Sequence, residues 1–194
     1  MTALSETVEA EIAALAERYG QPRRVAVTLE GSPFSPIGKS DRFGEVCMVL
    51  RRPNGRLLTA IKTFYPPGAF RLLTGGVGHG ESIEAALARE VAEETGLDVA
   101  VRHFLAVVEY RYQELHFATF AFLLDETGGV LGVQDEAEQI AAFRELLPEE
   151  LPALAQTLEE VPDEYHPEIE GRWRDWGRFR AVAHRVVYEA LGDL

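Results

Sequence analysis

The pattern of apolar and polar residues predicts helices at both ends of the chain. Apolar residues recur at spacings of three and four over residues 4–19, which is typical of an amphipathic helix, and Gly20 and Pro22 end it. A second apolar stripe predicts a helix at about residues 174–191, and residues 147–160 also have a helical pattern. The two terminal segments are therefore predicted to be mainly helical.

Strands are predicted in the middle of the chain, where apolar, β-branched and aromatic residues form short runs. Pro53, Asn54 and Gly55 form a turn signal that predicts a hairpin. Residues 75–80 contain four glycines in six positions, and we expect this segment to bend tightly. The predicted strands cover residues 23–30, 43–52, 56–64, 101–112, 115–126 and 139–144.

A further helix is predicted directly after the glycine-rich segment. Ser82 is a suitable N-cap, and Gly96 is a suitable C-cap after Thr95. Apolar residues at positions i, i+4 and i+8 give this helix one apolar stripe, formed by Ile83, Leu87 and Val91.

Three glutamates of this helix suggest chemistry. At 100° per residue, Glu90, Glu93 and Glu94 fall within an arc of roughly 100°. A solvated acidic face is one explanation, but such a face should lie opposite the apolar stripe. The centre of the glutamate arc lies only about 70° from the centre of the stripe. The glutamates therefore border the buried side, where hard cations such as Mg²⁺ or Mn²⁺ would offset their repulsion.

Composition and charge narrow the class of protein. The 194 residues suffice for one domain, and the 46% hydrophobic content is ordinary for a globular protein. No apolar run approaches the ~20 residues of a membrane span. Acidic residues occur throughout the first twenty positions, which argues against a signal peptide and for a cytoplasmic protein. We expect neither a membrane nor a secretory location.

The net charge of −13 argues against a nucleic-acid polymer as partner, because such a polymer requires a cationic surface. A small phosphorylated compound is compatible with this charge if local cations bind it. The single cysteine, Cys47, excludes an intramolecular disulfide and is expected to be a buried apolar residue. The five histidines show no metal-ligand spacing.

The order of residues 75–97 resembles the complete Nudix box, G-x5-E-x7-R-E-U-x-E-E-x-G-U, in which U is a bulky aliphatic residue. All nine specified positions match, and a chance match is roughly one in 10⁵ or rarer from ordinary residue frequencies. The matching residues are Gly75, Glu81, Arg89, Glu90, Val91, Glu93, Glu94, Gly96 and Leu97.

The resemblance implies an α+β fold, the Nudix-type α/β/α sandwich with a mixed sheet and helical extensions at both termini. We expect residues 1–194 to form a single domain with its core at residues 41–151. Residues 1–40 would add an N-terminal helix and strand, and residues 152–194 would add a C-terminal helical extension.

The resemblance also implies roles for residues of the box. Glu90, Glu93 and Glu94 would bind the metal. In the alternative, Glu93 or Glu94 would orient or deprotonate the attacking water. Glu81 would lie behind these ligands or bind a further ion. Thr74 stands where the family has a glycine whose carbonyl oxygen can bind metal, although threonine tolerates a positive φ poorly.

Three box residues have structural roles in the family. The Arg89 guanidinium would pair with box carboxylates and hold the loop, although a plain pair of residues on the helix surface is the alternative. Gly75 and Gly96, with Gly80 between them, would permit tight turns.

Residues outside the box complete the expected site. An acid after the box is expected at Glu138, with Glu136 and Asp135 as alternatives, and a solvated acidic loop explains each of them equally well. Arg51, Lys62 and Arg71 are candidates for binding substrate phosphate, against the commoner role of surface residues. Four aromatic residues would stack a base, or simply pack: Phe64, Tyr65, Phe70 and Tyr110. Trp173 and Trp176 would cap a pocket, or dock their helix on the core.

The resemblance therefore implies an enzyme that uses Mg²⁺ or Mn²⁺ to hydrolyse a small organic pyrophosphate, with ADP-ribose or a nucleotide sugar favoured. The alternative is a Nudix-like module that binds a nucleotide and regulates without hydrolysis. Such modules commonly lose box glutamates, whereas this chain keeps all of them. An N-terminal helix and strand are also compatible with a homodimer.

Overall fold

The computed structural model describes residues 4–194, so residues 1–3 of the predicted N-terminal extension lie outside the described part. The helices are α1 (Glu6–Tyr19), α2 (Ile83–Thr95), α3 (Leu151–Glu159) and α4 (Trp173–Gly192). The strands are β1 (Arg23–Thr28), β2 (Arg42–Arg51), β3 (Leu57–Lys62), β4 (Arg71–Gly78), β5 (Leu97–Tyr112), β6 (Leu115–Gly129), β7 (Ile140–Leu146), β8 (Tyr165–His166) and β9 (Gly171–Arg172).

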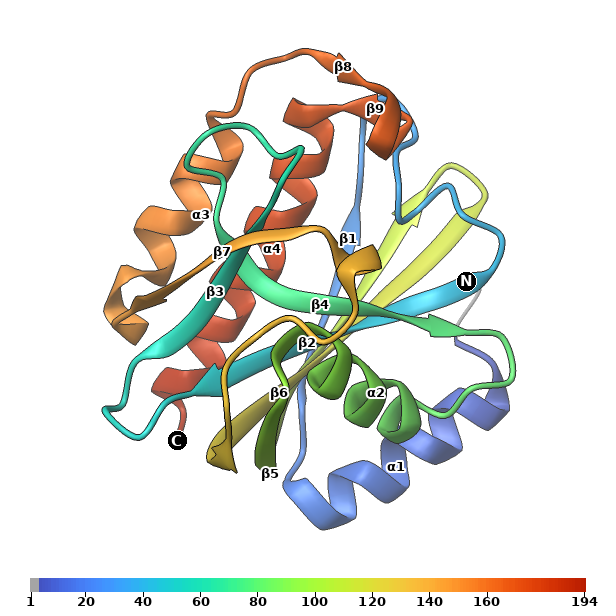
Figure 1. The fold of residues 1–194 in the computed structure, drawn as a ribbon. Coiled ribbons are helices and arrows are strands. Elements are labelled where there is room, and N and C mark those ends of the chain that lie inside the picture. The colour runs from blue at the N-terminus through green and yellow to red at the C-terminus, as the bar shows by residue number, and fades with distance from the viewer. Residues whose placement is uncertain (1–3) are drawn as a thin grey trace.

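Seven of these strands form one mixed sheet in the order β1-β5-β6-β2-β4-β3-β7 (Figure 1). β1 runs parallel to β5, and β2 runs parallel to β6, whereas the remaining neighbours are antiparallel. The predicted α+β class with a mixed sheet is confirmed. The short strands β8 and β9 pair with each other in the segment between α3 and α4.

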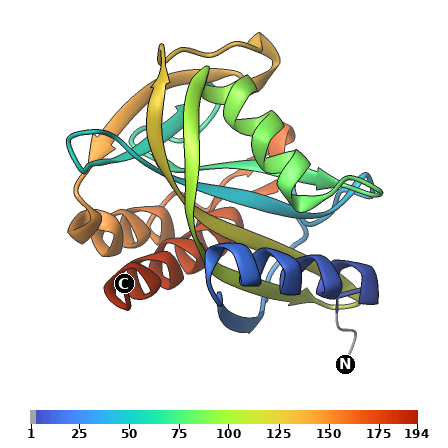
Figure 2. The same cartoon turned by 90° about the horizontal axis from the view of Figure 1, so that it is seen from below.

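Helices cover both faces of the sheet, and strand β2 shows why. Cys47 and Val49 pack in a cluster with residues of α3 and α4, whereas Val46, Met48 and Leu50 pack in a cluster with residues of α1 and α2. This period of two places alternate side chains on opposite faces. The predicted α/β/α sandwich is therefore confirmed, and Figure 2 shows α3 and α4 side by side beneath the sheet.

Strand β4 is a long strand that the sequence did not predict. It pairs with β2 on one side and with β3 on the other, so it is an inner strand of the sheet. The expected tight bend at residues 75–80 is wrong for most of that segment, because Gly75, Gly76 and Gly78 lie in the strand. Only Gly80 of these residues has a positive φ, at 85°.

The N-terminal helix is joined to the start of α2. A carboxylate oxygen of Glu11 accepts hydrogen bonds from the backbone N–H groups of Ile83, at 2.6 Å, and Glu84, at 3.4 Å. The Ser82 hydroxyl accepts another from Ala85 at 3.1 Å, as expected of the predicted N-cap. A helix start leaves such N–H groups without intrahelical partners, so α1 stabilises the helix that carries the glutamates.

The C-terminal helix is joined to β4 from the other face. His184 of α4 accepts a hydrogen bond from the Leu72 backbone N–H through Nε2 at 3.0 Å, and its Nδ1 lies 2.7 Å from the Arg180 carbonyl oxygen. The imidazole is therefore neutral, with Nδ1 as the donor. Burial lowers the pKa of His184 to about 4.

Within residues 4–194, none of the helices combines the length and apolar character that a membrane span requires.

The neutral His184 predicts a pH dependence of stability. In the unfolded chain a histidine has a pKa near 6.5, so below that pH the unfolded state binds the proton and the folded state does not. The free energy of unfolding should therefore fall as the pH drops from about 6.5 towards 4, by about 2 kcal/mol at pH 5 from this residue. Urea denaturation between pH 7.5 and 5 measures it.

The variant His184→Gln keeps an acceptor near Leu72 but no longer titrates, so its stability should change less over this range than that of the wild type. His103→Gln removes a histidine from an exposed position of β5 and is the matched control. Equal slopes for the wild type and His184→Gln would contradict the prediction.

Candidate metal-binding active site

Helix α2 and strand β4 lie so close together that the first residue of the motif, Gly75, has no room for a side chain. A Cβ atom at Gly75 would overlap Cδ and Cγ of Glu90, whose side chain lies directly over the strand. Glu90 is 5% exposed and Glu94 is 1% exposed. The prediction that glutamates border the buried side of the helix is therefore confirmed for these two residues.

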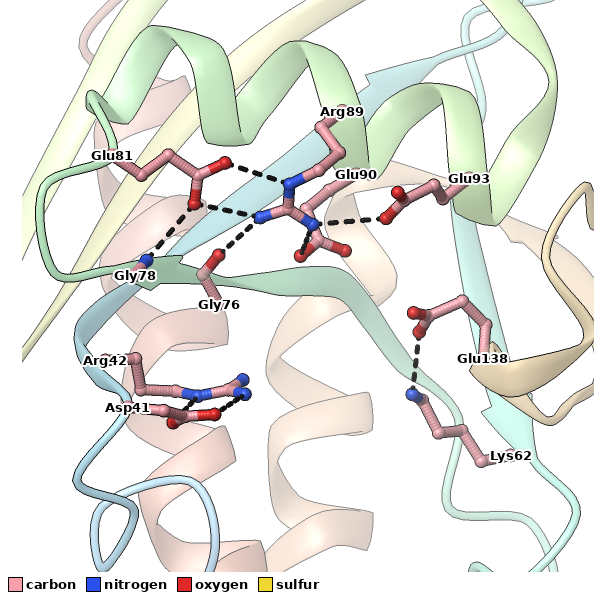
Figure 3. Close-up of polar contacts among 10 residues, drawn as sticks. All are labelled: Asp41, Arg42, Lys62, Gly76, Gly78, Glu81, Arg89, Glu90, Glu93 and Glu138. Atoms are coloured by element: carbon pink, nitrogen blue, oxygen red, sulfur yellow. Dashed lines mark hydrogen bonds and ion pairs between the residues drawn. The ribbon is translucent and has the colours of Figure 1, made fainter.

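The Arg89 guanidinium joins the helix to the loop before it (Figure 3). Its Nε and Nη2 donate to the two carboxylate oxygens of Glu81 at 2.9 and 3.0 Å, and Nη2 also donates to the Gly76 carbonyl oxygen at 2.9 Å. Its Nη1 donates to Glu90 at 2.7 Å and to Glu93 at 3.1 Å. These partners, Glu81 first, raise the pKa of Arg89, so its charge is permanent.

Glu94 differs from the other box carboxylates because it has no partner. Both of its carboxylate oxygens are buried and accept no hydrogen bond from any described residue. Burial raises the pKa of Glu94 to about 8, although Arg71 and Lys62 act in the opposite direction. A buried carboxylate without a partner is costly, so this side chain fits a site that a cation completes.

Three carboxylates converge at this point. Glu90, Glu94 and Glu138 each offer one oxygen atom, and these atoms lie within 4.8 Å of one another. Glu138 comes from the loop before β7, so a residue distant in sequence meets the helix. Oxygen-only donor sets of this kind suit hard divalent cations such as Mg²⁺ and Mn²⁺. The residues present therefore fit a divalent metal ion.

Two other candidate ligands lie beside this group. Glu93 is partly exposed and is bound by Arg89, outside the three converging carboxylates. Thr74 lies in β4 in an extended conformation, outside the described residues with positive φ, so its side chain causes no backbone strain. Its hydroxyl accepts a hydrogen bond from Arg71 at 3.0 Å, and the residue lines the pocket in front of the carboxylates.

The candidate phosphate-binding residues are separated by the fold. Lys62 lies in the site, where its Nζ is 3.0 Å from a carboxylate oxygen of Glu138. Arg71 is 4% exposed and donates to the Tyr65 hydroxyl at 2.9 Å as well as to its own strand. Arg51 lies at the opposite end of β2 from Arg42 and binds Asp125 at 2.8 Å.

Two basic residues of the site were missed by the sequence analysis. Lys39 and Arg42 line a pocket of about 550 Å³ that also contains Glu81, Glu90 and Glu138. A Cβ atom at residue 76 would overlap the Arg42 guanidinium, so glycine at that position gives the side chain its place. The only sequence signal was that Arg42 directly precedes a predicted strand, and this does not say which end of the strand faces the box.

The remaining candidates have other surroundings. Asp135 and Glu136 are exposed, and Asp135 caps the short turn that carries Glu138 by accepting from the Ala137 N–H at 2.9 Å. The Arg144 guanidinium lies 4.4 Å from the ring centroid of Phe70. Tyr110, Trp173 and Trp176 are buried. Phe64, Tyr65 and Trp176 line a pocket next to the carboxylates.

A separate, mainly apolar pocket of about 540 Å³ lies between α1 and the β5–β6 hairpin. It includes Phe43, Phe117 and Glu81, but none of the three converging carboxylates. The chemistry is therefore concentrated in the polar pocket that Lys39 and Arg42 line.

The close contact between β4 and α2 predicts the effect of a methyl group. Gly75→Ala should lower the free energy of unfolding by about 1–3 kcal/mol, because the added Cβ forces the Glu90 side chain or the helix to move. Chemical denaturation measures this change. Gly132→Ala is the matched control, because a Cβ there would meet only a flexible side chain at 3.8 Å. A loss no larger than that of the control would contradict the close packing.

Comparison with known proteins identifies the family of this chain. The family model of the NUDIX domain matches residues 41–169. An ADP-ribose pyrophosphatase from Methanocaldococcus jannaschii is 34% identical over 129 residues, which cover 66% of this chain and 72% of that protein. The NAD-capped RNA hydrolase NudC from Stutzerimonas stutzeri is 31% identical over 122 residues, covering 63% of this chain and 43% of that protein.

Among solved structures, that of a UDP-X diphosphatase superposes on 99% of this chain and 73% of its own, with a TM-score of 0.52 and 13% identity. At this identity the likeness concerns the fold alone. The family match covers more than half of the chain and includes both the acidic helix and Glu138. The chain therefore belongs to the NUDIX domain family and is a Nudix hydrolase.

Proposed function

We propose that the protein hydrolyses the pyrophosphate linkage of a nucleoside diphosphate derivative, with Mg²⁺ or Mn²⁺ held by Glu90, Glu94 and Glu138. The observation that carries this proposal is the buried carboxylate of Glu94, whose two oxygens have no partner beside two further carboxylates. ADP-ribose is the favoured substrate class, because a relative that is 34% identical is an ADP-ribose pyrophosphatase.

The pocket in front of the carboxylates has the charges that a pyrophosphate requires. Lys39, Arg42 and Lys62 line it, opposite the acidic residues of the box. The chain as a whole has a net charge of −13, so these local cations and the bound metal must offset its repulsion of an anionic substrate. We assign Lys39 and Arg42 to the phosphate groups that lie farthest from the carboxylates.

A bound divalent ion would neutralise phosphate oxygens, polarise the phosphorus atom and lower the pKa of a coordinated water. Water attacks phosphorus, and the bond from phosphorus to the bridging oxygen breaks. The protein must accept the proton of that water, and we assign this step to Glu138. Glu138 offers one oxygen to the metal, so its second oxygen accepts the proton, and Lys62, 3.0 Å from Oε2, holds the side chain in place.

Arg89 has a positioning role in this mechanism. It binds three carboxylates and one carbonyl oxygen, so its donors are committed within the protein and not to the substrate. Its pairing with Glu81 also lowers the pKa of that carboxyl, which therefore stays ionised at the turn before the helix.

Removing single carboxylates tests the metal site. Glu94→Gln and Glu138→Gln should each lower turnover by about 100-fold or more, because each residue supports several kcal/mol of transition-state stabilisation. Saturating Mn²⁺ should raise the melting temperature of the wild type by about 5–10 °C, and that of Glu94→Gln by much less. Calorimetric melting curves and phosphate-ester product assays measure these effects.

Glu136→Gln removes an acid from the same short turn as Glu138, but from an exposed position outside the converging group, and is the matched control. Its turnover and its metal-dependent melting shift should equal those of the wild type. If the three variants behave alike, the assignment of the metal site fails.

A substrate panel tests the reaction itself. Incubating the protein and Mg²⁺ or Mn²⁺ with ADP-ribose, UDP-glucose, a dinucleoside polyphosphate and NADH should give two phosphorylated products from at least one compound, identified by mass spectrometry. Tight binding of these compounds without any product would instead indicate a non-catalytic nucleotide-binding module.

A further inference from the structure

The pocket in front of the carboxylates contains an acid that the proposed mechanism does not use. Asp41 lines this pocket beside Arg42, and 62% of its side chain is exposed. A carboxylate at this place repels an anionic substrate, so its charge alone does not account for its position.

Asp41 holds one edge of the Arg42 guanidinium. Nε donates to Oδ1 at 2.7 Å and Nη2 donates to Oδ2 at 2.9 Å, so two parallel hydrogen bonds fix the plane of the group (Figure 3). These bonds lower the pKa of Asp41 to about 2, so the pair is ionic at neutral pH. The contact is therefore a two-point attachment of the guanidinium, and it directs the side chain.

The other edge of the guanidinium lies over strand β4. Nη1 donates to no described residue, and Nη2 has a second N–H beside the one that Asp41 accepts. A Cβ atom at residue 76 would overlap Nη1, so the glycine backbone makes room for this edge, and Gly76 and Arg42 line the same pocket. Two N–H groups on one edge of a guanidinium match two oxygens of a phosphate group. The Nη1–Nη2 edge therefore has the form of a phosphate-binding fork.

Arg42 has more than one direction in which it could point. It lines the pocket of the carboxylates and also a smaller adjoining pocket of about 220 Å³. The wall of the smaller pocket includes three residues from outside the box, Ser35, Glu168 and Arg180. After Asp41, the carboxylates of Glu90 and Glu45 are the next groups that raise the pKa of Arg42, and each borders one of the two pockets. A guanidinium without Asp41 would be drawn towards either of them.

The backbone fixes both members of the pair. The Asp41 carbonyl oxygen accepts a hydrogen bond from the His79 N–H at 3.3 Å. Arg42 pairs with Gly78 of β4, and the register of the two strands shifts between Arg42 and Gly44. A bulge of this kind bends a strand and changes the direction of a side chain. The pair is thus attached to the end of β4 and to the loop before α2.

Asp41 has two opposed effects on a bound anion. Its charge offsets part of the charge of Arg42 and weakens the attraction for phosphate, but water screens this effect because the carboxylate is mostly exposed. Its two hydrogen bonds restrict a long side chain before the substrate arrives, so binding loses less rotamer freedom. The second effect acts through short, direct contacts, and we expect it to be the larger one.

We propose that Asp41 is a positioning residue for the pyrophosphate, holding Arg42 so that its Nη1–Nη2 edge receives two phosphate oxygens. The proposal rests on the function proposed above and deepens it by naming the group that directs the phosphate-binding arginine. Asp41 itself does not touch the substrate.

Calorimetry with a pyrophosphate mimic tests the proposal, because positioning and charge predict opposite signs. Methylenediphosphonate, in which a CH₂ group replaces the bridging oxygen, is titrated into the full chain with Mg²⁺ in excess. Asp41→Ala should weaken its binding about tenfold if the carboxylate positions Arg42, whereas loss of a negative charge alone would tighten it. Unchanged or tighter binding by Asp41→Ala overturns the proposal. Absence of binding to the wild type would remove the pyrophosphate site and this proposal with it.

A double-mutant cycle shows whether Asp41 acts through Arg42. In the Arg42→Ala background there is no guanidinium to hold, so adding Asp41→Ala should leave the affinity unchanged or raise it. An equal loss in both backgrounds contradicts the positioning role. Asp125→Ala is the matched control, because Asp125 accepts from Nε of Arg51 at 2.8 Å at the opposite end of β2, outside the pocket. It should bind the mimic as the wild type does.

Kinetics separate this proposal from the proposed function. On a compound that the wild type hydrolyses, Asp41→Ala should raise KM about tenfold and change kcat little, because Arg42 binds phosphate in the ground state and in the transition state alike. A loss confined to kcat counts against the positioning role. Weaker binding of the mimic by Asp41→Ala in a protein that hydrolyses no compound of the panel would remove the proposed function alone. Hydrolysis with unaltered binding of the mimic would remove only the role of Asp41.

Discussion

Two carboxylates, those of Glu90 and Glu94, are buried where helix α2 crosses strand β4, and the rest of the site is arranged around them. Burying a charged group costs several kcal/mol unless partners replace its water. Glu90 has Arg89 as its partner, whereas Glu94 has none within the described chain. The two side chains thus differ in their surroundings: Glu90 shares the Arg89 guanidinium with Glu81 and Glu93, whereas Glu94 has no hydrogen-bond donor among the described residues.

The terminal extensions hold this crossing from both faces of the sheet. On one face, Glu11 of α1 caps the start of α2. On the other face, His184 of α4 binds the backbone of β4 at Leu72, two residues before Thr74. The position of the strand and of the helix is therefore fixed by parts of the chain that contain no residue of the box. This explains why the extensions belong to the same sheet and core as the box.

The sequence predicted the local features of the site well because their signals are local. The caps of α2 and the burial of its glutamates follow from residue types and from the 100° rotation per residue. Glu93 and Glu94 are neighbours in sequence, but that same rotation turns one towards Arg89 and the other into the interior. Family resemblance treats the two alike, whereas the fold separates them.

What the sequence did not predict depends on contacts between distant segments. Residues 75 and 76 of strand β4 are both glycines, so this part of the strand lacks the alternation of apolar and polar side chains that predicts a strand. Glycine is needed at both positions because Glu90 and Arg42 occupy the space that a Cβ atom would fill. Arg42 and Arg51 lie at the two ends of one strand, and only the strand's place in the sheet shows which end meets the carboxylates. Such information is absent from any single segment.

The cleft is built from two sets of residues that are separate in the chain. The carboxylates and their arginine come from α2 and the turn before β7, whereas the wall formed by Ser35, Glu168 and Arg180 comes from the loop after β1 and the C-terminal segment. The side chains of Ser35 and Glu168 make no hydrogen bond or ion pair with a described residue of α2 or β4, so substitutions at these two positions spare the packing of α2 on β4. Substitutions in the wall alone can therefore change which compound binds, while purifying selection preserves the carboxylates and their arginine.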